Sequence, residues 1–399
     1  MARSDRQASL TILSLAIGAF GIGVTEFATM GLLPFYASDL GVSEPQAGHA
    51  ISAYALGVVI GAPVLSLLGA RLERKRLLIL LIAFFGLANL IGAFAPSLDL
   101  LIAARFAAGL PHGAYLGVSM LFAAELSPSR RSAVAVAQVL MGLTVANIVG
   151  VPLAGAVGQM FGWRWSFVIV AAIAALCALA IARTAPAVRD GVPSNPVSEL
   201  RALANLSIWL TLGIGAVGSG AIFAVYSYLS AAMIDAAQAP AWSIPLALSC
   251  FGIGSTAGSY LAGRLTAWSQ FGASLLLLIG LAMSALLYAA VVGSWPLMAL
   301  SVLLMGLMSG LVIPLQMRLM QVAGEAQTLA AALNHAAFNA ANALGPLLAG
   351  LALSAGYGWA SSGVVGAGLA IGGILVLALA WAHARRPRPP MAVQRPTAL

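Results

Sequence analysis

Two ionisable side chains lie inside long apolar segments of this sequence, where a charge is costly. Glu26 falls in segment 10–36 and Arg105 in segment 99–123. A charged group at the centre of a bilayer costs about 2.5–3.5 kcal/mol on an insertion scale, so it usually has a function. A medium of low dielectric favours the neutral form of a carboxyl group, whereas a nearby guanidinium favours the charged form. Because these two effects oppose each other, Glu26 is a candidate to bind a proton or a cationic solute. The alternative is a structural Glu26–Arg105 pair that joins two helices.

Other polar residues within the apolar segments are candidates to line a cavity. His335, Asn339 and Asn342 are spaced i, i+4 and i+7, which places them on one helix face. The predicted substrate contacts are Glu26, Tyr54, Gln138, Asn147, Tyr226, His335, Asn339 and Asn342. The alternative for the amides is hydrogen bonding between helices, worth about 1 kcal/mol each. Three aromatic residues of the seventh segment could contact an apolar or aromatic substrate or could simply pack between helices: Phe223, Tyr226 and Tyr228.

His112 is a third candidate for proton coupling, beside Glu26 and Arg105. It lies in the same segment as Arg105, one or two helical turns away. Imidazole changes its charge near neutral pH, so a histidine there can relay protons. A hydrogen-bonded packing histidine is an equally good interpretation.

The segments that carry these residues predict an all-α integral membrane protein. Of the 399 residues, 61% are apolar and only 8% are charged, which excludes a soluble domain because such domains carry about 25% charged residues. About 20 apolar residues span a bilayer as a helix. Twelve segments reach that length: 10–36, 46–69, 77–95, 99–123, 132–158, 164–183, 205–231, 242–263, 272–293, 296–318, 327–354 and 359–383.

The basic residues support twelve spans with both termini in the cytoplasm. With that topology, every basic residue except Arg105 and Arg164 falls on the cytoplasmic side. Loops on that side of a membrane are enriched in Lys and Arg, and a miscounted helix would destroy the alternation.

The chain divides into two related halves. We predict a six-helix bundle at 1–184, a cytoplasmic linker at 185–204 and a second six-helix bundle with a basic cytoplasmic tail at 205–399. The string ANIVGVPLAG at Ala146–Gly155 resembles ANALGPLLAG at Ala341–Gly350, and each is followed within a few residues by Gly-Trp. Two pseudo-symmetric halves with a binding site between them are a common transporter architecture.

Several other classes of protein are excluded or disfavoured. The only lysine, Lys75, is flanked by arginines, so the chain has no Walker A loop. The two cysteines and four histidines form no metal-binding or nucleophile pattern, so we expect no metal and no enzyme activity. The basic residues are not interleaved with aromatic residues on one face, so we expect no nucleic-acid partner.

Five strings resemble the major facilitator superfamily, in particular its twelve-helix drug/proton antiporter branch and the bacterial sugar-efflux and arabinose-associated exporters. They are TEFATMGLLP (Thr25–Pro34), YALGVVIGAP (Tyr54–Pro63), RLERKRLL (Arg71–Leu78), ARFAAGLPHGAYLG (Ala104–Gly117) and NIVGVPLAG (Asn147–Gly155). The resemblance extends over essentially the whole chain. It implies the major facilitator fold.

The resemblance also implies roles for particular residues. Arg105 resembles an arginine implicated in proton coupling, and Glu26 matches an acidic position that some relatives use for substrate or proton. The antiporter motif of the fifth span implies export, although Val151 interrupts its usual Gly-Pro pair. In the loop after the second span, Ala70 and Glu73 replace the usual aspartate and glycine. The residues expected to act in conformational change are Gly150, Pro152, Gly155, Arg71 and Arg74.

Together these features predict a proton-coupled secondary transporter that exports a small molecule, such as a sugar or a drug-like solute, by alternating access. The expected location is a bacterial cytoplasmic membrane. We expect a monomer that is driven by the proton gradient and has no cofactor. The alternatives are a proton-coupled importer of the same fold and a membrane protein that does not transport.

Overall fold

The computed structural model describes residues 2–69, 72–128, 132–186, 204–323 and 327–385. The described residues of the first half form α1 (Ala2–Gly31), α2 (Leu33–Asp39), α3 (Glu44–Gly69), α4 (Arg74–Ala93), α5 (Leu98–Glu125), α6 (Ser132–Val145), η1 (Ala146–Gly150), α7 (Val151–Phe161) and α8 (Trp163–Thr184). Most of the predicted linker and basic tail lies outside the described residues.

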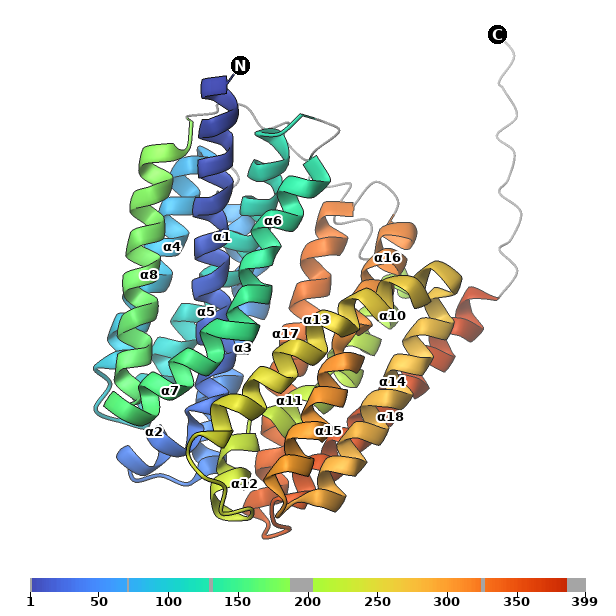
Figure 1. The fold of residues 1–399 in the computed structure, drawn as a ribbon. Coiled ribbons are helices and arrows are strands. Elements are labelled where there is room, and N and C mark those ends of the chain that lie inside the picture. The colour runs from blue at the N-terminus through green and yellow to red at the C-terminus, as the bar shows by residue number, and fades with distance from the viewer. Residues whose placement is uncertain (1, 70–71, 129–131, 187–203, 324–326, 386–399) are drawn as a thin grey trace.

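The described residues of the second half form α10 (Leu206–Gly218), α11 (Gly220–Tyr226), α12 (Leu229–Asp235), α13 (Ser243–Trp268), α14 (Gln270–Val291), α15 (Trp295–Met308), η2 (Ser309–Leu311), α16 (Val312–Ala323), α17 (Gln327–Ser354) and α18 (Ala360–Ala384). In Figure 1, α1 to α8 lie on one side of the molecule and α10 to α18 on the other. The described part of the chain contains no β-strand.

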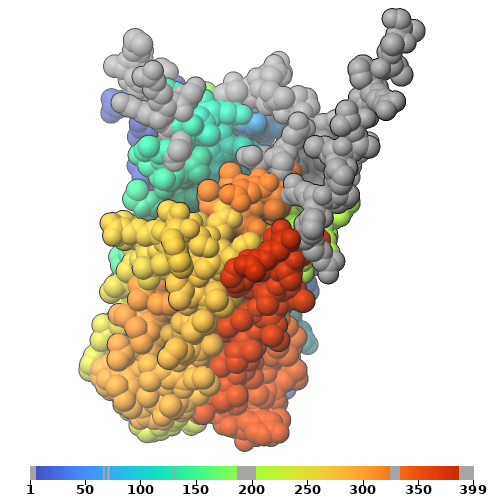
Figure 2. Space-filling model, turned by 90° about the vertical axis from the view of Figure 1, so that its right-hand side faces the viewer, coloured from blue at the N-terminus to red at the C-terminus, as the bar shows by residue number. Residues whose placement is uncertain are grey.

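Twelve helices among the described residues are long and apolar enough to cross a membrane, which confirms the predicted fold class. The elements that face the viewer in Figure 2 include α14 and α18, and these helices carry exposed apolar side chains such as Leu276, Met283 and Leu375. A bilayer solvates such a surface, whereas water would not.

Four of the predicted spans are interrupted rather than continuous, the first of them at Leu32 between α1 and α2. The fifth span contains the π-turn η1, in which the Val151 N–H bonds to the Ala146 carbonyl. Pro152 follows directly and has no N–H to offer the Ile148 carbonyl, which is a common cause of such a distortion. The seventh span breaks at Ser219 and again at Ser227 and Tyr228, and the tenth contains the 3₁₀ turn η2. Hydropathy does not register these interruptions.

Glycines allow the closest helix crossings. A Cβ atom on Gly57, Gly61 or Gly109 would lie 2.1–2.2 Å from a backbone oxygen of the partner helix where α3 crosses α5. At the crossing of α13 and α15, Gly254, Gly258 and Gly306 repeat the arrangement with distances of 2.2–2.4 Å. Small residues at such crossings let helices pack closely in lipid.

The two halves repeat one polar contact at the end of the bundle where α2 and α12 lie (Figure 1). The Trp163 indole donates to Asp39 Oδ2 at 3.1 Å, and the Trp359 indole donates to Asp235 Oδ2 at 2.6 Å. Arg164 also forms an ion pair with Asp39. Hydrogen bonds from Arg164 and Trp163 hold the pKa of Asp39 below its ordinary value. Trp163 is the first residue of α8 and Trp359 is the N-cap of α18, and each follows a glycine with positive φ, Gly162 or Gly358.

Candidate functional site

Glu26 lies where the two halves meet. It belongs to α1 and is half-buried, and its Oε1 accepts a hydrogen bond from Asn342 Nδ2 of α17 at 3.2 Å. The second carboxyl oxygen has no hydrogen-bond partner among the described residues, and it is not fully buried. The carboxyl group therefore joins the halves through one oxygen and leaves the other available.

Arg105 and Glu26 do not form the structural ion pair that is the alternative interpretation of these two residues. The Arg105 side chain is only 1% exposed, and Nη1 donates to Thr25 Oγ1 at 3.0 Å while Nη2 donates to the Thr25 carbonyl at 3.3 Å. Thr25 and Glu26 are consecutive, so their side chains leave α1 in directions about 100° apart. The ion pairs of the described residues instead involve Arg74, Arg76 and Arg164.

Two further side chains, Tyr54 and Asn89, help to fix the position of Arg105. Its guanidinium carbon lies 4.1 Å from the centre of the Tyr54 ring, a cation–π contact. Thr25 Oγ1 in turn donates to Asn89 Oδ1 at 2.8 Å. Asn89 was absent from the predicted site, although it is a polar residue within an apolar span, the same signal that identified Asn147.

Tyr54 connects Arg105 to His112. The Tyr54 hydroxyl lies 2.9 Å from His112 Nδ1, and both side chains are buried. Arg105, Tyr54 and His112 thus form a connected polar cluster on α3 and α5, next to the Thr25–Glu26 segment of α1.

An aromatic cluster surrounds the residue after Glu26. The Phe27 ring lies 6.3 Å from Phe223, 6.0 Å from Tyr226 and 6.1 Å from Phe251. Tyr226 and Phe251 are 4.7 Å apart. These rings come from α1, α11 and α13, so both halves contribute. Phe223 and Tyr226 were among the predicted aromatic contacts. Phe27 and Phe251 were not, because they look like ordinary membrane residues until the helices are paired.

The remaining predicted contacts are more dispersed. Asn339 is buried and donates to the His335 carbonyl at 3.1 Å, while His335 itself is half-buried. Asn147 is half-buried within η1, and Gln138 is exposed on α6. Tyr228 donates to the Pro346 carbonyl at 3.0 Å, a packing contact with α17.

The residues predicted to act in conformational change have different surroundings. A Cβ on Gly150 would lie 2.4 Å from Val24 of α1, whereas one on Gly155 would make an ordinary contact with Leu248 of α13. Pro152 lies in the first turn of α7. Arg74 forms an ion pair with Glu125 at the end of α5. Arg71 lies outside the described residues.

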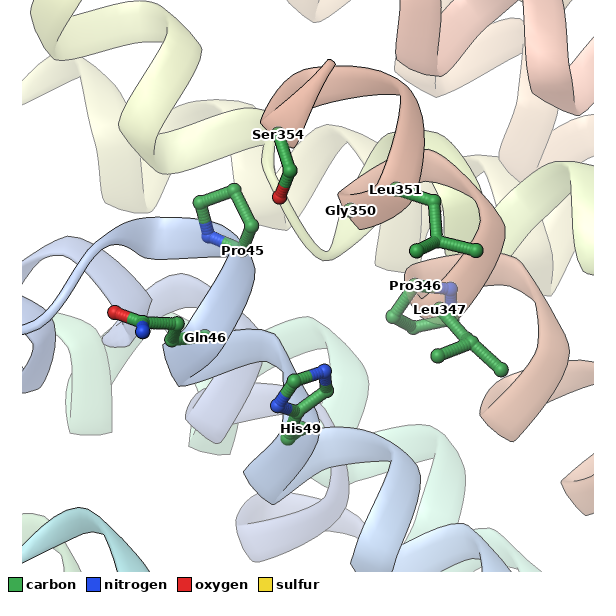
Figure 3. Close-up of a pocket in the computed structure, with 8 residues that line it drawn as sticks. All are labelled: Pro45, Gln46, His49, Pro346, Leu347, Gly350, Leu351 and Ser354. Carbon is green, nitrogen blue, oxygen red and sulfur yellow. The ribbon is translucent and has the colours of Figure 1, made fainter.

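A small pocket lies between α3 and α17, towards the end of the bundle that contains α2 and α12. Figure 3 shows Pro45, Gln46 and His49 of α3 on one side and residues of α17, among them Gly350 and Leu351, on the other. Deeper along the same pair of helices, Ser52 Oγ donates to the Ala343 carbonyl at 3.0 Å. We call this contact between α3 and α17 the α3–α17 seam.

Twelve membrane-spanning helices around a polar and aromatic site between two halves define a multi-pass membrane transporter. A family model of the Major Facilitator Superfamily matches residues 15–269 and 208–399, and the chain belongs to that family. Its members are membrane transporters rather than enzymes, as predicted.

Named relatives and a solved structure agree with this assignment. The chain is 39% identical to the inner membrane transport protein YdhP of Escherichia coli (strain K12) over 361 residues, 89% of this chain and 92% of YdhP. It is 32% identical to the putative transporter AraJ of the same organism, covering 87% of this chain and 89% of AraJ. A bacterial homologue of the human lysosomal transporter Spinster, solved in an inward-facing, occupied conformation, has the same fold. Its TM-score is 0.74 at 16% identity, covering 96% of this chain and 98% of that one.

Proposed function

We propose that this protein is a proton-coupled secondary transporter that exports a small molecule across the bacterial inner membrane by alternating access. The bond between Glu26 of α1 and Asn342 of α17 carries this proposal, because it places an ionisable group at the contact between the moving parts. The moving parts are the bundles 1–184 and 205–399, joined by the linker 185–204. Both termini are cytoplasmic, the protein acts as a monomer, and the proton gradient replaces a cofactor.

Glu26 is the group that both solute and proton use. Its available oxygen and the Phe27 cluster suit a solute with an apolar body and a hydrogen-bond donor or positive charge, such as a drug-like molecule or a sugar. A proton on the carboxyl group removes the charge that such a solute needs. Occupation by one therefore opposes occupation by the other, which is the requirement for exchange.

The polar cluster beside Glu26 maintains the site. Arg105 is held by Thr25 and Tyr54, so its positive charge stays near Glu26 without neutralising it through direct contact. Tyr54 and His112 extend this cluster within α3 and α5 and provide a hydrogen-bonded route for protons. Inward movement of one proton releases about 2.3 kcal/mol per 100 mV of membrane potential, which is available to drive export.

The test is a transport assay in liposomes that contain the purified protein and a pH-sensitive dye. After a proton gradient is imposed, addition of a transported solute should dissipate it at a rate that saturates with solute concentration. A panel of sugars and lipophilic drugs, with counterflow in both directions, identifies the solute and the direction. Solute movement that saturates but leaves the proton gradient unchanged would contradict proton coupling.

A further inference from the structure

Asn342 contains a buried polar atom that the described structure leaves unsatisfied. The side chain is 1% exposed, and its Nδ2 donates to Glu26 Oε1. Its Oδ1 is buried and has no hydrogen-bond partner among the described residues. A buried acceptor without a donor costs free energy, so such an atom requires an explanation.

The missing donor is one that Glu26 can supply only when it carries a proton. A carboxylate has acceptors alone, whereas a carboxylic acid also has an O–H donor. An acid and an amide can form two hydrogen bonds side by side: the amide N–H donates to one acid oxygen, and the acid O–H donates to the amide oxygen. The first bond is present between Asn342 and Glu26, and the second carboxyl oxygen has no partner.

We propose that Asn342 detects the proton on Glu26, because protonation adds a second hydrogen bond between α1 and α17 and thereby tightens the neighbouring α3–α17 seam, since α3 packs against α1. In this step a proton from water binds a lone pair of Glu26 Oε2, and the new O–H donates to Asn342 Oδ1. When the proton leaves, that bond is lost and Oδ1 is again unsatisfied, so the seam is weaker. Asn342 is thus a positioning residue that converts proton occupancy into contact between the halves, and this role rests on the proposed proton coupling.

Titratable groups on the neighbouring helices have to be distinguished from Glu26. Those on helices that contact α1 or α17 include Tyr54 on α3, Arg105, His112 and Tyr115 on α5, Cys177 on α8, Tyr226 on α11, Cys250 on α13 and His335 on α17 itself. No hydrogen bond is described between any of them and Asn342, whose described side-chain bond goes to Glu26. Asn339 provides a matched control: it lies on the same helix, is buried, and also has an unsatisfied Oδ1, but its amide donates to the His335 carbonyl.

The experiment measures the seam directly, without solute or gradient. Spin labels at His49→Cys and Leu351→Cys report the distance across the pocket of Figure 3 by double electron–electron resonance in lipid nanodiscs between pH 5 and pH 9. Replacing His49 also removes an imidazole whose own titration would confuse the result. Cys250→Ser prevents a third label, while buried Cys177 remains.

We expect the short-distance population to increase about fivefold, relative to the open one, as the pH falls, which is the effect of one ordinary hydrogen bond. Glu26→Gln should hold the seam closed at every pH, because its amide supplies both bonds permanently. Asn342→Leu should abolish the pH response, and Asn339→Leu should retain it.

A pH-independent distance in the unmutated background, a normal pH response in Asn342→Leu, or an open seam in Glu26→Gln would each overturn the inference. Failure of this inference can be distinguished from failure of the proposed function. A seam that responds to pH in a protein without solute-driven proton flux would contradict only the proposed function. Proton-coupled transport with an unresponsive seam would contradict only the role of Asn342.

Discussion

Gly109→Ala should lower the free energy of unfolding by about 1–3 kcal/mol or more, the usual cost of overpacking a tight core. The added Cβ would lie 2.1 Å from the Tyr54 carbonyl oxygen and 3.1 Å from the Val58 nitrogen. Both are backbone atoms of α3, so no side-chain rotation can relieve the clash and α3 must move away from α5. Because Tyr54 is the ring on which Arg105 rests, the same movement should also reduce transport.

Gly117→Ala is the matched control. Gly117 continues the four-residue glycine spacing on α5, but a Cβ there would meet nothing within 4 Å. We expect its stability to equal or slightly exceed that of the wild type, because alanine favours helix. Unfolding in mixed detergent micelles, followed by tryptophan fluorescence, compares the variants. Equal stability of Gly109→Ala and wild type would show that α3 and α5 cross less closely than described.

Arg105→Lys should reduce solute-driven proton flux at least about tenfold even though the positive charge is retained. The guanidinium donates from two nitrogens to Thr25 and stacks on Tyr54 at the same time. An ammonium group is compact and lacks the planar fork, so it cannot reproduce both contacts. The measurement is the initial rate of proton movement in liposomes with matched protein content.

Arg164→Lys is the control for that substitution. Like Arg105, Arg164 stacks on an aromatic ring, that of Trp163. It forms an ion pair with Asp39, but it lies at the end of the bundle and is partly exposed. Exposed ion pairs contribute little, so transport should remain near the wild-type rate. Equal transport rates in Arg105→Lys and Arg164→Lys would show that the two hydrogen bonds and the ring contact of Arg105 are not required for transport.

The sequence predicted the number of spans, the family and most of the polar residues of the site. Hydropathy and charge alternation are sufficient for the spans because lipid imposes a fixed helix length and cytoplasmic loops favour arginine. Glu26 and Arg105 were identifiable because charge in an apolar span is costly. The spacing of residues along one helix, however, does not indicate which face of a second helix those residues contact.

The pairings that the sequence did not predict follow from that limit. Glu26 and Arg105 were placed at similar depth, yet the rotation of α1 directs Thr25, and not Glu26, towards Arg105. Phe27 and Phe251 are 224 positions apart, so their contact depends on how the halves assemble. Gln138 was predicted from its polarity alone; it is exposed on α6, and its contact with a substrate stays a prediction.

The central claim is that one carboxyl group, that of Glu26, serves both solute and proton. The most direct test compares solute-driven proton flux in liposomes for wild type, Glu26→Gln and the control Asp99→Asn, an exposed carboxyl group in the first turn of α5. We predict that the flux falls to background in Glu26→Gln and is unchanged in Asp99→Asn. Equal flux in wild type and Glu26→Gln would contradict the claim and leave Glu26 with a structural role.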